Sequence, residues 1–196
     1  MNLKGNLVEK IFLIGFNKCG TTTFWNFFVK NNIKAVHWDY GNIARNFYYR
    51  KSRDEPPMLD YGSVFAFTDM ICVTNNNILE PYKDFDYIFR FYPTAYYILN
   101  TRNVLNWIES RCNHHQLLNR YKQVLRTQSD NEVIDYWLKE WFEHHQNVIK
   151  FFNGNNKFLY YDIENDPVQK VTSFLKENCD LNEKQWEHKN VTNRLN

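Results

Sequence analysis

A short segment of the chain, residues 15–23, combines the residue types that bind phosphate groups. Gly15 and Gly20 allow backbone N–H groups to turn inward, and Lys18 supplies a positive charge. An apolar run precedes the segment and a stretch with helical spacing follows it, so a helix start adds unpaired donors and a partial positive charge. The alternative is a plain turn with a lysine in solvent. The candidate anion ligands are Lys18, Cys19, Gly20, Thr21, Thr22 and Thr23.

The position of the lysine separates this loop from the Walker A loop of nucleotide triphosphatases. In that loop the lysine stands immediately before a serine or threonine. Here Lys18 precedes the second glycine, Gly20, and two residues separate it from Thr21. The order predicts a lysine that does not reach the far phosphates of a triphosphate.

A second candidate anion site combines Arg102 with Ser110. Arg102 ends a run rich in strand formers, and Ser110 follows eight residues later, about two turns into a predicted helix. An arginine fork at a strand end suits a phosphate, and a serine hydroxyl can donate a further hydrogen bond to it. Taken alone, the pair is also compatible with a surface salt bridge and a solvated helix residue.

In this order along the chain, the two sites resemble those of the PAPS-dependent sulfotransferase family, PAPS being 3′-phosphoadenosine-5′-phosphosulfate. The segment from Lys18 to Thr22 is similar to the family's 5′-phosphosulfate loop, which reads lysine, any residue, glycine, threonine, threonine. Arg102 and Ser110 resemble the family's 3′-phosphate motif. The resemblance implies that Lys18 lies beside the bridging oxygen of the phosphosulfate.

A third match lies near the end of the chain, at residues 160–167. It is similar to the family's YED-then-DP segment, with Tyr161 in place of the usual glutamate. The resemblance implies that Tyr160 approaches the adenine, while the alternative is that both tyrosines only pack between sheet and helix. A further departure concerns the cytosolic branch, where a tryptophan follows the two threonines; here Thr23 holds that place and Trp25 comes two residues later.

The activity implied by the resemblance is transfer of a sulfuryl group from PAPS to a hydroxyl or amine, with release of PAP (3′-phosphoadenosine-5′-phosphate). The acceptor class stays open between a glycan, a lipid and a small molecule. This chemistry requires no metal, and the sequence has no convincing metal-ligand cluster. Two alternatives remain: a P-loop kinase acting on a small molecule with Mg²⁺ and a triphosphate, and a catalytically inert nucleotide-binding module.

Sulfuryl transfer requires charge stabilisation at the leaving phosphate and a base for the acceptor proton. Lys18 fits the first role, and Asp69, which follows a predicted strand, is the preferred base. His37 and Asp39, after an earlier predicted strand, are the second choice. Two pairs of adjacent histidines have the character of surface residues: His114 with His115, and His144 with His145.

These residues must be positioned by strands that alternate with helices. The alternation predicts an α/β fold of the three-layer P-loop type, in which helices flank a central, mostly parallel β-sheet. The predicted strands are residues 11–14, 34–37, 64–67, 95–101 and 157–161. The predicted helices are residues 21–30, 40–50, 84–92, 103–118, 131–152 and 167–178. A length of 196 residues fits a single domain over 1–196.

Bulk composition excludes several classes of protein. A net charge of +2 is too small for a protein that wraps nucleic acid, and apolar and charged fractions of 43% and 23% are those of a globular protein. Four scattered cysteines indicate neither a zinc site nor a disulfide framework. No apolar run approaches the roughly 18 residues of a membrane span, so we expect a cytoplasmic protein whose oligomeric state stays open.

Overall fold

The computed structural model describes residues 9–187 of the chain and contains a five-stranded parallel sheet. The strands are β1 (Ile11–Leu13), β2 (Ala35–His37), β3 (Ala66–Thr68), β6 (Tyr96–Thr101) and β7 (Phe158–Asp162). Their order across the sheet is β2-β3-β1-β6-β7, with β1 in the centre. Because every pairing within this sheet is parallel, the carboxyl ends of all five strands lie at one edge.

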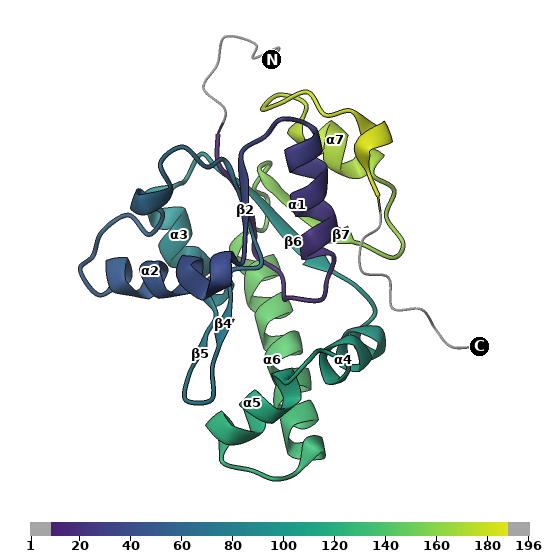
Figure 1. Ribbon diagram of the computed structural model, residues 1–196. Helices are drawn as coiled ribbons and strands as arrows, with labels where there is room; N and C mark the ends of the chain where they lie inside the picture. Colours follow the sequence, from purple (N-terminus) through teal and green to yellow (C-terminus); the bar gives the residue numbers. More distant parts are fainter. Residues whose placement is uncertain (1–8, 188–196) are drawn as a thin grey trace.

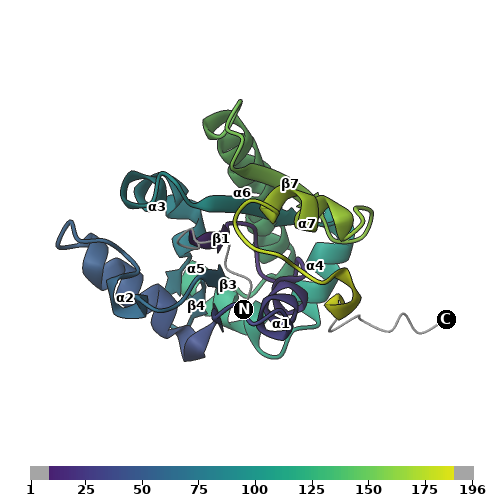
Figure 2. The ribbon, with the colours of Figure 1, turned by 90° about the horizontal axis from the view of Figure 1, so that it is seen from above.

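Helices cover both faces of the sheet and complete three layers (Figures 1 and 2). One face packs against α1 (Thr21–Lys30) and α7 (Gln169–Leu175). The layer on the other face contains α2 (Asn42–Lys51), α3 (Phe85–Phe91), α4 (Val104–Cys112), α5 (Leu117–Leu125) and α6 (Asp130–Phe151). The predicted α/β class, with helices flanking a central parallel sheet, is confirmed.

The central strand contributes to both hydrophobic cores. Ile11 and Leu13 belong to the core under α1 and α7, whereas Phe12, and Ile14 directly after the strand, belong to the core under α3 and α6. This division follows from the strand itself, in which successive side chains point to opposite faces. Each such buried side chain contributes roughly 1.5–3 kcal/mol to folding, so the short apolar run fixes the position of the loop that follows it.

One predicted helix, residues 103–118, is wrong in its extent. The structure ends α4 at Cys112 and starts α5 at Leu117, and Gln116 between them has a φ of 60°. The turn lets α5 bury Leu117 and Tyr121, and the Tyr121 ring lies 5.2 Å from that of Trp137 on α6. A continuous helix would carry these side chains away from α6, so tertiary packing overrides the helical pattern.

The sequence analysis also missed several short elements. An antiparallel hairpin pairs β4 (Cys72–Val73) with β5 (Ile78–Leu79). Two-residue strands leave too short a pattern for periodicity to detect. Within residues 9–187, short 3₁₀ helices lie at Asp39–Gly41, Leu59–Tyr61, Pro81–Asp84 and Glu183–Gln185.

The expectation that His144 and His145 lie on the surface is wrong. Both are buried on the sheet side of α6. His144 Nε2 donates to the Ile14 carbonyl at 2.6 Å, and burial is the main reason that its pKa falls to about 4. His145 donates from Nδ1 to the Trp141 carbonyl, and its Nε2 accepts from the Thr101 hydroxyl at 2.8 Å. Both rings are therefore neutral, and their hydrogen bonds link α6 to the sheet and to the end of β1.

No helix among residues 9–187 combines the length and the apolar character that a membrane crossing requires. All four cysteines fall within these residues and carry free thiols. Three of them, Cys19, Cys72 and Cys179, are buried.

Candidate functional site

The loop between β1 and α1 approaches the neighbouring strand β6 closely at Gly15. A Cβ atom at Gly15 would lie 1.9 Å from the Asn100 carbonyl oxygen, so only glycine fits. Further along, Lys18 and Gly20 have φ values of 65° and 79°. A left-handed backbone is rare for lysine and costs about 1–2 kcal/mol, so the surrounding contacts must hold Lys18 in place.

Asn100, at the buried end of β6, holds the loop from inside. Its Oδ1 accepts from the Gly15 N–H at 3.0 Å. Its Nδ2 donates to two loop carbonyls, that of Phe16 at 3.4 Å and that of Cys19 at 3.0 Å. Asn100 is fully buried, so a single amide satisfies three buried backbone groups that water does not reach.

Two further side chains hold the remaining carbonyls of the loop. Trp107 Nε1 on α4 donates to the Asn17 carbonyl at 3.0 Å. Arg102 Nη1 donates to the Lys18 carbonyl at 3.2 Å. Together with Asn100, these donors fix four successive carbonyls, those of residues 16–19, to the β6 and α4 side. The sequence analysis missed Asn100 and Trp107.

The opposite side of the loop presents backbone donors. Within the described chain, the N–H groups of Lys18, Gly20 and Thr21 have no protein acceptor. No side chain caps the start of α1, and its first turn contains no acidic residue. No side chain of α1 itself therefore offsets the partial positive charge of this helix start, a setting that suits an anion.

The loop residues predicted to bind the anion differ in how exposed their side chains are. The Cys19 side chain is fully buried in the core and burial raises its thiol pKa, so only its backbone faces the site. Thr23 is also buried, at 1% exposure, which places its side chain within α1 packing. Thr22 is more exposed, and its hydroxyl lies 3.4 Å from His37 Nε2.

His37 and Asp69, predicted as alternative bases, lie together at the carboxyl ends of β2 and β3. His37 Nε2 is 3.8 Å from Asp69 Oδ2. The Thr68 hydroxyl donates to the Val36 carbonyl and lies 2.9 Å from His37 Nδ1. With its proton directed to Val36, that hydroxyl accepts from Nδ1, so the neutral ring keeps its lone pair on Nε2, facing Asp69 and Thr22.

Asp69 has the surroundings of a carboxylate with raised basicity. Its side chain is 17% exposed, and its Oδ1 is buried without a hydrogen-bond partner among residues 9–187. Burial raises the pKa of Asp69, against the opposing charges of His37, Lys18 and His114. Burial likewise lowers the pKa of His37, with Asp69 opposing that change. Burial therefore shifts both groups toward their neutral forms, and each group opposes that shift in the other.

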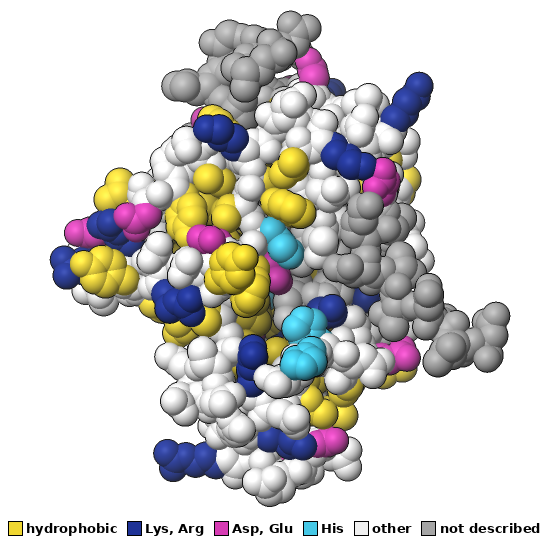
Figure 3. All heavy atoms as spheres, in the orientation of Figure 1, with side chains coloured by type: hydrophobic (Ala, Val, Ile, Leu, Met, Phe, Trp, Pro, Cys, Tyr) yellow, Lys and Arg dark blue, Asp and Glu magenta, His cyan; other side chains and the backbone are white. Residues whose placement is uncertain are grey.

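Lys18 connects the loop with this pair. Burial is the largest cause that lowers the pKa of its ammonium group, Asp69 raises it, and Arg102 lowers it further. Figure 3 shows histidine, acidic and basic side chains together near the centre of the face seen in Figure 1. The structure thus brings Lys18, His37 and Asp69 to one place from three different strand ends.

Arg102, at the end of β6, contacts a carboxylate that the sequence analysis missed. Its Nε and Nη2 donate to Glu164 Oε1 at 3.1 and 2.5 Å. Ser110 is 7% exposed on α4 and makes no hydrogen bond through its hydroxyl within the described residues. No sequence signal marks Glu164, because it reaches Arg102 from a turn 62 residues away.

The aromatic residues considered as adenine contacts differ in their exposure and in the rings that they pack against. Tyr161 is buried and packs against Phe24 at 5.3 Å, so the packing alternative holds for this residue. Tyr160 is 42% exposed, with its ring 6.5 Å from that of His145. Trp25 stacks on His37 at 5.8 Å. Tyr160 therefore keeps a surface that a base can approach, whereas Trp25 supports the His37 ring.

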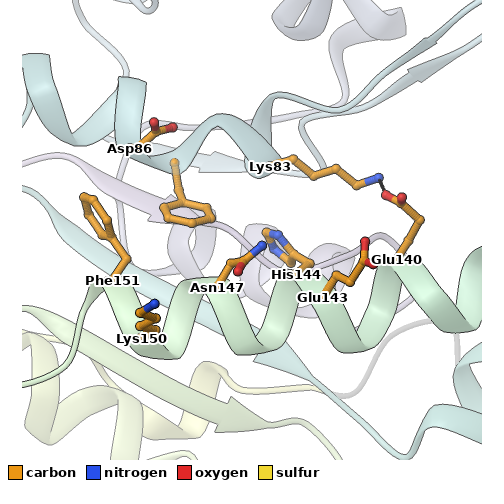
Figure 4. A pocket seen from close by; sticks show the side chains of 9 residues that line it. Lys83, Asp86, Glu140, Glu143, His144, Asn147, Lys150 and Phe151 are labelled. Carbon is orange, nitrogen blue, oxygen red and sulfur yellow. Dashed lines mark hydrogen bonds and ion pairs between the residues drawn. The ribbon is translucent and has the colours of Figure 1, made fainter.

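A separate hollow of about 560 Å³ lies between α3 and α6 (Figure 4). Lys83 forms an ion pair with Glu140 there, and His144 lies among the lining residues, with its ring 5.9 Å from that of Phe85. None of the predicted ligand or base residues lines this hollow. Its lining contains both acidic and basic side chains, so it shows no concentration of positive charge.

No family model matches the chain, and no curated protein matches its sequence. Within residues 9–187, His, Cys, Asp and Glu side chains form no group of three or more that could hold a metal ion.

Replacement of Asn100 by alanine tests its hold on the loop. Asn100→Ala leaves three buried backbone groups unpaired, and we expect the free energy of unfolding to fall by about 2–4 kcal/mol. Urea unfolding followed by tryptophan fluorescence measures the loss. Asn119→Ala, at an exposed position on α5, is the control and should change stability by less than about 0.5 kcal/mol. Equal effects of the two variants would show that the loop is held by other means.

The raised pKa of Asp69 predicts a pH-dependent gain in stability for Asp69→Asn. The folded protein holds the Asp69 proton more tightly than the unfolded chain, so its ionisation destabilises the fold as pH rises above the ordinary value of 3.8. We expect Asp69→Asn to be more stable than the parent by roughly 0.5–2 kcal/mol at pH 7.5, with no gain below about pH 4.

Urea midpoints across this pH range measure the difference. The exposed Asp135→Asn on α6 removes the same charge without relief of burial and should show no such gain. A loss of stability in Asp69→Asn at pH 7.5 would contradict the account of Asp69 as a strained, buried carboxylate.

Proposed function

We propose that the chain is a sulfotransferase that binds PAPS at the β1–α1 loop and transfers its sulfuryl group to a hydroxyl or amine of an acceptor. The observation that carries this proposal is that side chains of β6 and α4 fix the orientation of the loop by donating hydrogen bonds to the carbonyls of residues 16–19. The backbone N–H groups at the start of α1 are then left for the 5′-phosphosulfate. Arg102 beside the loop supports a second anion site for the 3′-phosphate.

Lys18 takes the electrostatic role in the proposed reaction. As the sulfur–oxygen bond to the 5′-phosphate breaks, the bonding electron pair goes to the phosphate oxygen and PAP leaves. An ammonium group beside that oxygen stabilises the developing negative charge. The left-handed backbone at Lys18 and the partly buried setting of its side chain support a fixed position for this charge.

The His37–Asp69 pair takes the proton role. An acceptor oxygen or nitrogen forms the new bond to sulfur, and its proton passes to His37 Nε2, the ring nitrogen with the lone pair. Asp69, 3.8 Å from this nitrogen, stabilises the imidazolium that results. The Thr68 hydroxyl at Nδ1 and the stacked Trp25 ring hold the imidazole in orientation.

Exposed aromatic rings beside this pair support an acceptor with an apolar face. Trp38 and Tyr40 are 42% and 76% exposed, and their rings lie 5.5 Å apart. Residues 38–40 all have φ near 50°, a conformation that costs energy for bulky side chains and occurs at ligand-contacting positions. Arg45 holds the segment by donating to the Tyr40 carbonyl at 2.7 Å.

Thermal unfolding with PAP tests the donor site. In the presence of EDTA, PAP at about a hundred times its dissociation constant should add roughly 2.7 kcal/mol of stability. Lys18→Ala and Arg102→Ala should each respond less. Lys139→Ala, a variant of an exposed lysine on α6, should respond as the parent does. If PAP has no effect while ATP with Mg²⁺ stabilises the protein, the kinase alternative replaces the proposal.

A transfer assay then separates an enzyme from a nucleotide-binding module. Release of PAP from PAPS in the presence of glycan, lipid or phenolic acceptors supports the enzyme, and His37→Ala should lower the rate by a factor of about 10²–10⁴. Binding of PAP without transfer to any acceptor would favour the inert module.

A further inference from the structure

Glu164 binds Arg102 in the way that a phosphate would. Its Oε1 accepts from Arg102 Nε and Nη2, and its Oε2 accepts from the Asn103 N–H at 2.9 Å. Asn106 Nδ2 lies 3.0 and 3.1 Å from the two carboxylate oxygens. An arginine fork, a backbone N–H at a helix start and a side-chain amide are the donors that bind a phosphate.

The start of α4 is arranged so that its backbone donor points to this anion. The Asn103 side chain caps the helix by accepting from the Leu105 and Asn106 N–H groups. The N–H of Asn103 itself stays outside that cap and donates to Glu164. The carboxylate therefore takes both the charge of Arg102 and the donor at the helix start.

The turn after β7 delivers this carboxylate. The Glu164 N–H donates to Asp162 Oδ1 at 2.9 Å, and the Asp162 N–H donates to Asp166 Oδ2 at 2.8 Å. Burial would raise the pKa of Glu164, but the Asn103 N–H and Arg102 outweigh it and hold the pKa below its ordinary value. Glu164 is thus ionised at neutral pH and carries the same sign of charge as a phosphate.

We propose that Glu164 is a specificity-determining residue that competes with the 3′-phosphate of the nucleotide for Arg102 and the Asn103 N–H. This inference rests on the proposed function, because it takes Arg102 as the 3′-phosphate ligand. The carboxylate occupies the Nε and Nη2 edge of Arg102, and Nη1 donates to the Lys18 carbonyl, so a 3′-phosphate that binds this edge displaces the carboxylate. A nucleotide without a 3′-phosphate leaves the Glu164–Arg102 contact intact, so its affinity does not depend on Glu164.

Calorimetric titration of PAP and of adenosine 5′-monophosphate tests the competition. Glu164→Gln keeps the size of the side chain and removes its charge. We expect it to tighten PAP binding about tenfold and to change binding of the monophosphate by less than about twofold. Glu109→Gln removes the same charge from an exposed position on α4 and should leave both affinities near those of the parent.

Two results would overturn the inference. PAP binding that weakens in Glu164→Gln would show that Glu164 positions Arg102 for the nucleotide. Equal gains for PAP in Glu164→Gln and Glu109→Gln would assign the effect to overall charge.

Inorganic phosphate separates failure of this inference from failure of the proposed function. If neither nucleotide binds any variant, the nucleotide assignment fails, and phosphate titrations followed by melting temperature decide the role of Glu164 alone. Phosphate should stabilise Glu164→Gln more than the parent, and the additional change Arg102→Gln should abolish that gain. Phosphate responses that are equal in the parent and in Glu164→Gln would overturn the competition.

Discussion

The candidate site depends on one constraint: the carbonyl groups of the β1–α1 loop are bonded away from the site. Asn100 binds the first and last of these four carbonyls and the Gly15 N–H, and Trp107 and Arg102 bind the two between them. A peptide unit that turns its carbonyl inward directs its N–H outward. The anion-binding role that we propose for the loop therefore depends on polar side chains on β6 and α4 as much as on its own glycines.

Sheet topology then brings the other groups to the same edge. The central strand β1 lies between β3 and β6, so the loop after β1 has Asp69 on one side and Arg102 on the other. Ligands of open α/β sheets bind at this carboxyl edge. Lys18 has Asp69 in electrostatic reach, and Arg102 has Glu164 in direct contact. Each cation thus has a carboxylate nearby that lowers the free-energy cost of its burial, and an anion that binds either cation would compete with that carboxylate.

Sequence patterns predicted the parts of this arrangement that local chemistry encodes. The apolar run before Gly15, the glycines, and the helical spacing after Thr21 sufficed to place the loop at a strand end, and Lys18, His37 and Asp69 were identified by residue type after predicted strands. Asn100 could not be recognised, because a single amide within a buried strand has no local pattern that reveals its partners. The contact of Glu164 with Arg102 and the helix break at Gln116 depend on interactions between segments far apart in the sequence, which the spacing of apolar residues does not reveal. The burial of His144 and His145 was missed for the same reason, since only packing against β1 and β6 neutralises them.

Amide chemical shifts of the loop during titration with PAP test the central claim most directly. In a ¹H–¹⁵N spectrum, the account predicts that the N–H groups of Lys18, Gly20 and Thr21 form new hydrogen bonds and move downfield more than other amides, with saturation at a common concentration. If these three amides stay in place while amides beside exposed lysines shift, the loop does not bind the anion and the account of the site is contradicted.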